Sequence, residues 1–169
     1  HHASAQREMP VATLRELKCR VCPLDKLAQK LGSPKLGATG SARPSVYVLG
    51  GGRSEEGDQK GSHFAGEAGR LLQASIPSWA EASIRYGSVV RCYSMEQREP
   101  TPVEVTCCSG WLEEDIEATK PQVIIGVGPV PLSWALKKSA TYVWRGRLLP
   151  IKVGSHVCWF YHIYHPDQI

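Results

Sequence analysis

Cysteines are the residues of this sequence whose type and spacing are best suited to chemistry. Cys19 and Cys22 form a C-x-x-C pair, and Cys92 and Cys108 lie further along the chain. Two thiolates spaced as C-x-x-C can reach one metal centre, and two more distant thiolates can complete the site. The spacing alone leaves buried free thiols, a redox pair, zinc and an iron–sulfur cluster as alternatives. A redox pair is disfavoured because the C-x-x-C follows a helical run rather than a strand.

A glycine-rich segment is the second candidate site. Gly50, Gly51 and Gly52 follow an apolar run and precede Arg53 and several acidic residues. The segment contains neither G-x-x-x-x-G-K-[ST] nor G-x-G-x-x-G, so a nucleotide-binding loop is a poor fit. Glycines could instead let the backbone approach a DNA phosphate closely, or leave room for a bulky base.

The composition is that of a globular protein from a reducing compartment. The chain has 169 residues, of which 42% are hydrophobic and 21% charged, which suits a single domain. No run approaches the roughly twenty apolar residues of a membrane span, and no secretory signal is visible. We therefore expect a cytoplasmic protein with no membrane partner, whose thiols are free or bound to metal. The formal net charge of +4 is compatible with a polyanionic partner without requiring one.

Helical and strand patterns alternate along the chain. Two short helices are expected over 11–31, broken at Pro23, before a surface loop over 32–44. Thr101, Pro102 and Glu104 predict a helix start with a capping box. The other expected elements are strands at 45–49, 88–92, 122–127, 147–153 and 156–165 and helices at 64–76 and 131–138. This alternation predicts a three-layer α/β domain with a mainly parallel sheet, whose ligands sit at the carboxyl ends of the strands.

Several segments, in this order and spacing, resemble the iron–sulfur (family 4) uracil-DNA glycosylases of the uracil-DNA glycosylase superfamily. The resemblance runs from Cys19 to Asp167. "CRVCPL" resembles the N-terminal cysteine pair of that family, and "KGSHFAGEAGRLL" resembles its Q-G-x-P-F-x-G-x-A-G-x-L-L segment. The matching later segments are "SVVRC", "PTPVEVTCCSGWLEEDI", "KPQVIIGVG", "WRGR" and "YHPD".

The resemblance implies a fold, a cofactor and a site. The fold would be a three-layer α/β/α domain with a central, mainly parallel four-stranded sheet. The pocket would accept a base flipped out of DNA, with Phe64 stacking on it and His165 stabilising the negative charge of the departing base. The ligands of a [4Fe–4S] cluster would be Cys19, Cys22, Cys92 and Cys108. The spare cysteines, Cys107 and Cys158, are expected to have plain packing roles.

The departures from the family pattern fall on its chemistry. The family loop G-E-A-P-G is replaced here by residues 50–54, so that Gly51 stands in place of the acidic residue. Ser88 stands where an asparagine would read the pyrimidine edge, and a hydroxyl has one donor and a short reach, whereas an amide offers a donor and an acceptor on separate atoms. His63 replaces the usual proline, which predicts a polar group at the pocket mouth. Glu55, Glu56 or Asp58 could replace the missing acid if the loop folded differently, although a solvated acidic loop is the simpler interpretation.

These features lead to two main hypotheses. The first is an iron–sulfur DNA-binding domain with lost or strongly reduced uracil excision, which serves a larger replication or repair protein such as a polymerase of phage origin. The alternative is an active DNA glycosylase that acts on a uracil-like or modified base. A zinc or redox-structural protein unrelated to DNA is a third class. Candidate phosphate contacts are Arg53, Lys60, Arg70, Arg91, Arg145 and Arg147, with Arg145 favoured by its R-G element.

The expected domain organisation is simple. Residues 1–6 are interpreted as a tag remnant or disordered, and residues 7–169 as one domain that could be a piece of a longer protein. Its expected place is the cytoplasm, in the nucleoid or in a phage-infected bacterial cell.

Overall fold

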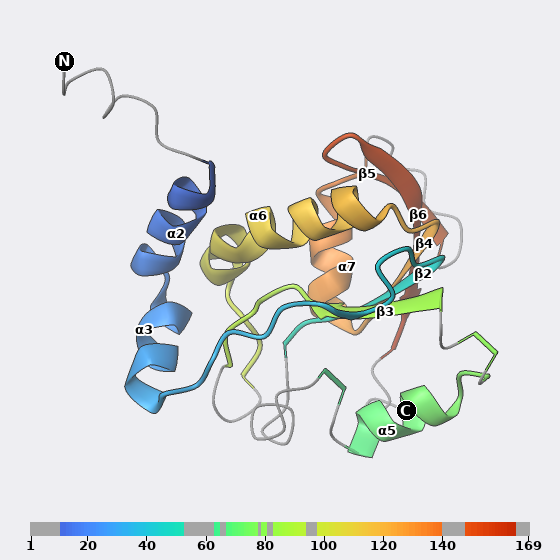
Figure 1. The fold of residues 1–169 in the computed structure, drawn as a ribbon, viewed down its shortest axis with the longest axis horizontal. Coiled ribbons are helices and arrows are strands. Elements are labelled where there is room, and N and C mark those ends of the chain that lie inside the picture. The colour runs from blue at the N-terminus through green and yellow to red at the C-terminus, as the bar shows by residue number, and fades with distance from the viewer. Residues whose placement is uncertain are drawn as a thin grey trace.

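Six strands form one sheet in the order β1-β3-β2-β4-β6-β5 (Figure 1). The computed structural model describes residues 11–52, 63–64, 67–77, 79–80, 83–93, 98–139 and 148–164. The strands are β1 Thr39–Gly40, β2 Val46–Gly50, β3 Ile84–Ser88, β4 Val123–Val127, β5 Leu148–Val153 and β6 His156–Ile163. The four central strands β3, β2, β4 and β6 are parallel, whereas β1 and β5 pair antiparallel at the two edges.

The sheet therefore confirms the predicted α/β class and its parallel centre, with two antiparallel edge strands added. The reason for one of them is local. A two-residue turn at Gly154 and Ser155 joins β5 to β6, and so short a connection can link only antiparallel neighbours. Gly154 has φ +59°, in the left-handed region that glycine tolerates without strain.

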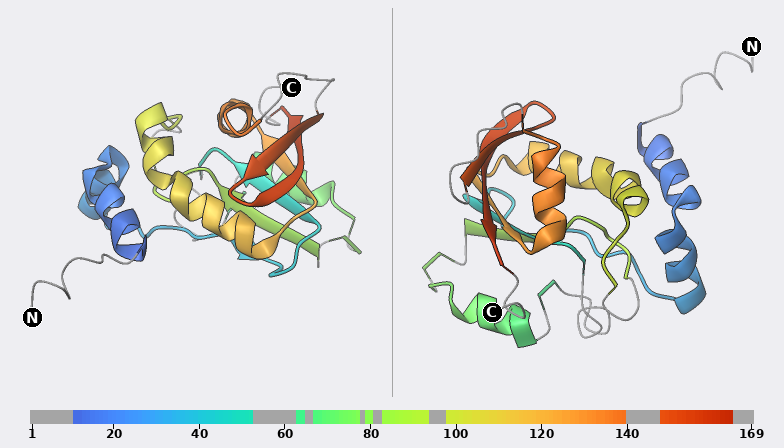
Figure 2. Two further views of the ribbon diagram at one scale, coloured as in Figure 1. Left: turned by 90° about the horizontal axis from the view of Figure 1, so that it is seen from above. Right: turned by 180° about the vertical axis from the view of Figure 1, so that it is seen from behind.

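Helices cover both faces of the sheet, which gives the three predicted layers (Figure 2). On one face, buried side chains of β2 and β4 pack against α6 (Pro102–Thr119) and α7 (Pro129–Leu136). On the other face, Val48, Ile84 and Tyr86 pack with Leu72 of α5 (Glu67–Ala74). Each strand thus alternates its side chains between two apolar layers.

The two helices that the pattern over 11–31 predicts are present, and both lie outside this sandwich. They are α2 (Val11–Val21) and α3 (Pro23–Leu31). Pro23 occupies the first turn of α3, where a missing N–H costs nothing. Figures 1 and 2 show α2 and α3 beside the first half of α6, away from the sheet. The link between this layer and the sheet therefore runs through α6.

The predicted start of α6 is confirmed. The backbone N–H of Glu104 donates to Thr101 Oγ1 at 3.3 Å, and the backbone N–H of Thr101 donates to Glu104 Oε1 at 2.8 Å. Arg98 donates to both carboxylate oxygens of Glu104, at 2.9 and 3.0 Å. Burial acts to raise the pKa of Glu104, but these hydrogen bonds outweigh it and hold the pKa below its usual range.

The predicted strand over 88–92 is wrong. The strand before it, β3, ends at Ser88, which pairs with Gly50 at the end of β2. The backbone N–H of Val89 donates to Gly50 O at 2.8 Å, after which the chain leaves the sheet. Val89 and Val90 are apolar because they are buried in a loop rather than in a strand. No helix in the described part of the chain is long and apolar enough to cross a membrane.

Candidate functional site

The expected ligand edge of the sheet is present. The ends of β2 and β3 lie side by side because Gly50 pairs with Ser88 in parallel register. The end of β4 lies next to the end of β6, where Val127 pairs with Ile163. The glycine segment and Ser88, which are 38 positions apart in the sequence, therefore meet at one edge. The predicted strand over 88–92 would have put Ser88 at the amino end of a strand instead.

Phe64 lies against this edge. A Cβ added to Gly50 would be 3.1 Å from Phe64 Cζ, so the ring occupies the space that a side chain at position 50 would need. The ring also packs edge-to-face on Tyr86, with centroids 6.0 Å apart. Phe64 has φ +53°, a left-handed conformation that costs a bulky residue about 1–2 kcal/mol and persists only where packing imposes it. This packing positions the ring beside the strand ends, and its stacking on a base stays a prediction.

Gly51 faces α7. A Cβ at this position would lie 3.0 Å from Val130 Cβ, tighter than nearly all such contacts in proteins. Val130 follows Pro129 at the start of α7 and is half-buried. The space next to Gly51 is thus filled by an apolar side chain. The contact between Val130 and position 51 could not be predicted from the sequence, because an apolar residue in a helix indicates only packing and no neighbouring residue connects it to position 51.

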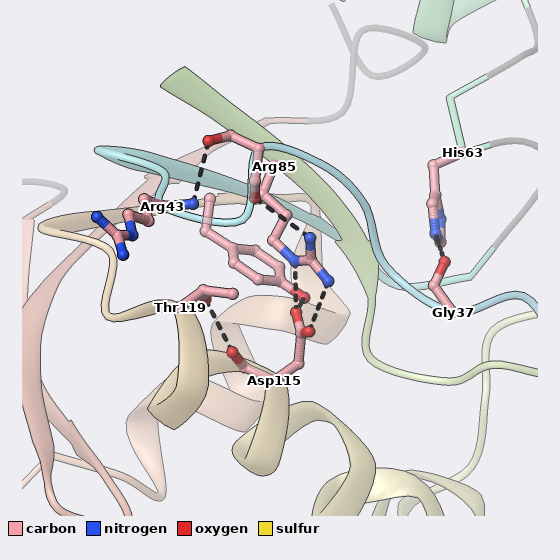
Figure 3. Close-up of polar contacts among 8 residues, drawn as sticks. Gly37, Arg43, His63, Arg85, Asp115 and Thr119 are labelled. Carbon is pink, nitrogen blue, oxygen red and sulfur yellow. Dashed lines mark hydrogen bonds and ion pairs between the residues drawn. The ribbon is translucent and has the colours of Figure 1, made fainter. Parts of the chain in front are cut away.

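His63 is buried rather than at a pocket mouth, which corrects the expectation for this residue. Only 5% of its surface is exposed. Its Nδ1 lies 3.1 Å from Ser88 Oγ. Its Nε2 lies 2.8 Å from Gly37 O, the contact that Figure 3 shows. The two residues that depart from the family pattern on either side of the strand ends, His63 and Ser88, are therefore partners of each other.

Some predicted site residues lie outside the described residues. They are His165, Arg53 and Arg145, together with Lys60, Arg147 and the loop acids Glu55, Glu56 and Asp58. In the described segments that follow β2, β3, β4 and β6 at this edge, no carboxylate occurs.

The four predicted ligand cysteines converge where α2, α3, α6 and the loop after β3 meet. All four are buried, and Cys22, Cys92 and Cys108 belong to one packed cluster. Burial raises the pKa of Cys108 to about 12, and the charges of Cys92, Cys22 and Cys19 act in the same direction. Burial also raises the pKa of Cys92. Such thiols resist ionisation unless a metal takes the place of the proton.

A charged pair stands beside these cysteines. The Lys35 ammonium donates to the buried Asp25 carboxylate, and Gln29 Nε2 donates to the other carboxylate oxygen at 2.8 Å. The hydrogen bond to Asp25 raises the pKa of Lys35, and the nearby charges of Cys92 and Cys19 raise it further. Lys35 is thus a cation placed close to the thiolates that a metal centre would need.

The two spare cysteines differ. Cys107 is half-buried, and burial raises its pKa. A negative charge on the neighbouring Cys22 raises the pKa of Cys107 further. Cys158 lies in the sheet core, where burial raises its pKa to about 11. Among the described residues, no three His, Cys, Asp or Glu side chains lie close enough to hold one metal ion.

A cavity of about 340 Å³ borders Ser88 and Gly37 and extends to α6. In its lining, Arg91 lies over the Trp111 ring at 4.4 Å from the centroid.

A hydrogen-bond network borders the other side of the cavity. Arg85 donates to both oxygens of Asp115, at 2.8 and 2.7 Å, as Figure 3 shows. The hydroxyl of Tyr47 donates to the same carboxylate at 2.7 Å, so β2 and β3 are tied to the second half of α6.

Comparison with known proteins places these features in a family. Residues 38–169 match the profile of the family described as "Uracil DNA glycosylase superfamily". The chain is 30% identical to a type-4 uracil-DNA glycosylase of Thermotoga maritima over 148 residues, 85% of this chain and 73% of the relative. It is 29% identical to one from Archaeoglobus fulgidus, over 66% of this chain and 55% of the relative.

A relative of another kind is also similar. The chain is 28% identical over 114 residues to a DNA polymerase of Bacillus phage SP01, which covers 66% of this chain and 12% of the polymerase.

Proposed function

The chain belongs to the uracil DNA glycosylase superfamily, and from this premise we propose that it is an iron–sulfur DNA-binding domain whose uracil excision is lost or strongly reduced. The observation that carries the proposal is the composition of the strand ends. Gly51 faces the apolar Val130, and the hydroxyl of Ser88 is engaged by His63. Hydrolysis of an N-glycosidic bond needs a positioned water and stabilised charge, and the described strand ends offer no carboxylate to orient that water.

The proposed cofactor is a [4Fe–4S] cluster held by Cys19, Cys22, Cys92 and Cys108. The donor set fits, since it consists of four buried cysteines with the cation of Lys35 beside them. A single zinc would draw four sulfurs within about 2.3 Å of one atom, and hence to within about 4 Å of one another. In a cluster each cysteine binds its own iron, so its sulfurs lie further apart than around zinc, and iron and zinc analysis of the purified protein distinguishes the two. When bound, the cluster would supply iron–thiolate bonds that cross-link α2, α3 and α6.

We propose DNA as the ligand of the strand-end edge. Phe64 lies at the ends of β2 and β3, and Arg70 on α5 is exposed close by in the chain. Phe64 is half-buried. Aromatic rings that stack on bases, combined with cations, are typical of sites that bind single strands. The similarity to part of a phage DNA polymerase supports a role within a larger replication or repair protein.

An active glycosylase for a modified base is the second candidate. Glycine at positions 50 to 52 leaves the strand end without side chains, and Ser88 and His63 keep polar atoms there. A modified base would meet these polar atoms in place of the amide and the acid of the family pattern.

One set of assays distinguishes the two candidates. The protein is incubated with oligonucleotides that contain uracil or modified pyrimidines, beside a known glycosylase, and abasic product is measured. We expect no uracil excision, together with a gel shift of single-stranded DNA that weakens as salt rises. Efficient uracil excision would disprove the lost-activity proposal, and the absence of any gel shift at low salt would disprove DNA binding.

A restored variant tests the cause of the loss. Gly51→Glu with Ser88→Asn returns the missing acid and amide, but the structure adds two requirements. Val130→Ala is needed to make room for the acid, and His63→Pro to release position 88. We expect uracil excision from the fourfold variant and not from Gly51→Glu alone.

A further inference from the structure

Each ring nitrogen of His63 has a hydrogen-bond partner, and together these partners favour one tautomer of the neutral ring. Its Nε2 lies 2.8 Å from the carbonyl oxygen of Gly37. A carbonyl can only accept, so in the neutral imidazole Nε2 carries the hydrogen and donates to Gly37. The other nitrogen, Nδ1, is then an acceptor. The hydroxyl of Ser88, 3.1 Å away, must donate to it.

This pattern determines what Ser88 can offer to a ligand. A hydroxyl has one hydrogen and two acceptor lone pairs, and the hydrogen is already directed at His63. Ser88 therefore presents an acceptor and no donor. An asparagine side chain in the same place would present both.

Ser88 stands where a base would be read. It is the last residue of β3, it pairs with Gly50, and it shares a strand face with Tyr86, two residues earlier. Both Gly50 and Tyr86 contact the ring of Phe64. Ser88 is half-exposed, so a ligand group can reach it. The cavity of about 340 Å³ that Ser88 also borders opens on the α6 side, beside Arg85 and Asp115, and Phe64 does not line it.

We propose that the His63–Ser88 pair makes this site select a nucleobase whose facing edge carries an exocyclic amine, as in cytosine, over the carbonyl edge of uracil. The amine donates to the free lone pairs of Ser88. Where position 4 of the base faces Ser88, the O4 carbonyl of uracil would meet another acceptor and lose its hydrogen bond to water without a replacement. The inference rests on the proposed function, because a base from DNA must enter the site.

The test is a binding experiment with matched single-stranded oligonucleotides. They differ only in one central base, which is cytosine, uracil or pyrimidin-2-one, the last having neither an amine nor a carbonyl at position 4. Binding is measured by fluorescence anisotropy at about pH 8, where an ordinary imidazole is neutral. We expect cytosine to bind roughly tenfold more tightly than uracil, which is the effect of one hydrogen bond, with pyrimidin-2-one between them.

Variants assign the preference to the pair. Ser88→Ala removes the acceptor and should abolish the preference, whereas Ser88→Asn should shift it toward uracil. His63→Leu frees the hydroxyl hydrogen, so Ser88 can donate or accept and the preference should fall. His63→Gln keeps one donor and one acceptor and should retain it. Circular dichroism and absorbance near 400 nm confirm that each variant is folded and loaded.

The outcomes separate this inference from the proposed function. DNA binding with equal affinity for cytosine and uracil overturns the inference alone. A cytosine preference that survives in Ser88→Ala also overturns it. Loss of binding to every oligonucleotide, from a wild-type protein that is folded and loaded, overturns the proposed function and the inference with it.

Discussion

The cysteine centre and the strand-end site contrast sharply. At the centre, every position expected to bind metal has its thiol, all four thiols are buried together, and a cation lies beside them. At the strand ends, the positions expected to carry an acid and an amide hold Gly51 and Ser88. The same chain thus keeps the residues of one site and replaces those of the other.

The difference teaches that the strand-end replacements are coupled. His63 is bonded to Ser88, and Val130 fills the space beside Gly51, so the altered residues form a packed arrangement of their own. A site that had simply decayed would leave unpaired polar groups or gaps, which are costly in a protein interior. We therefore regard the strand-end site as remodelled rather than decayed.

The largest effect is expected when the cysteine centre is broken. Cys108→Ala should abolish absorbance near 400 nm and unfold α2 and α3, because metal binding and folding are linked in such centres. Cys158→Ala is the matched control, since Cys158 is equally buried but lies in the sheet core. Absorbance and iron analysis of anaerobically purified protein measure the result. A wild-type protein that contains stoichiometric zinc and no iron would contradict the cluster.

The second-largest effect is expected when the hydrogen bonds that join α6 to β2 and β3 are weakened. Asp115→Asn weakens the bidentate bond to Arg85 and the bond from Tyr47, and we expect about 2–3 kcal/mol of lost stability. In a Tyr47→Phe background the same change should cost less, because the two residues share one network. Urea denaturation measures both. Glu114→Gln, on the exposed neighbour, should change stability by less than about 0.5 kcal/mol.

The stability of the protein should depend on pH through Glu104, at the start of α6. Its folded pKa is lowered, so its stabilising contribution is present above the unfolded value of about 4.3 and is lost as pH falls through the folded value. Glu104→Gln should cost about 1–2 kcal/mol at pH 7, since the partner Arg98 is 44% exposed. The difference from wild type should shrink as pH falls below the unfolded value and on through the lower folded pKa of Glu104. A difference that is independent of pH would contradict this role, and Glu99→Gln, an exposed change, is the control.

The smallest effect is expected at the strand ends. Gly51→Ala should destabilise by about 1 kcal/mol, because its Cβ would press on Val130. In a Val130→Ala background that cost should vanish, as thermal unfolding of the four proteins of the cycle would show. The cluster absorbance should not change in any of them. An unchanged cost in the Val130→Ala background would mean that this contact is not what excludes a side chain at position 51.

Local patterns were enough to predict much of the fold. The break at Pro23, the capping box of Thr101 and Glu104, and the parallel central strands follow from spacing and propensity within short windows. The predicted strand over 88–92 is wrong because Val89 and Val90 are buried in a loop, and an apolar pair does not distinguish a buried loop from a strand. The strand β3 was missed because Arg85 and Gly87 interrupt its apolar pattern. A Cβ at Gly87 would lie 2.5 Å from Tyr47 Oη, a requirement that only the packed structure reveals.

The sequence by itself determined which residue types are available: four cysteines at the spacing of a metal centre, glycines where an acid is expected, and a serine where an amide is expected. Only the tertiary structure decided what these residues do to one another. His63 meets Ser88 across 25 positions and Gly37 across 26, and Val130 meets Gly51 across a longer span still. Such contacts depend on how the strands pair and the helices pack, and no local pattern encodes them.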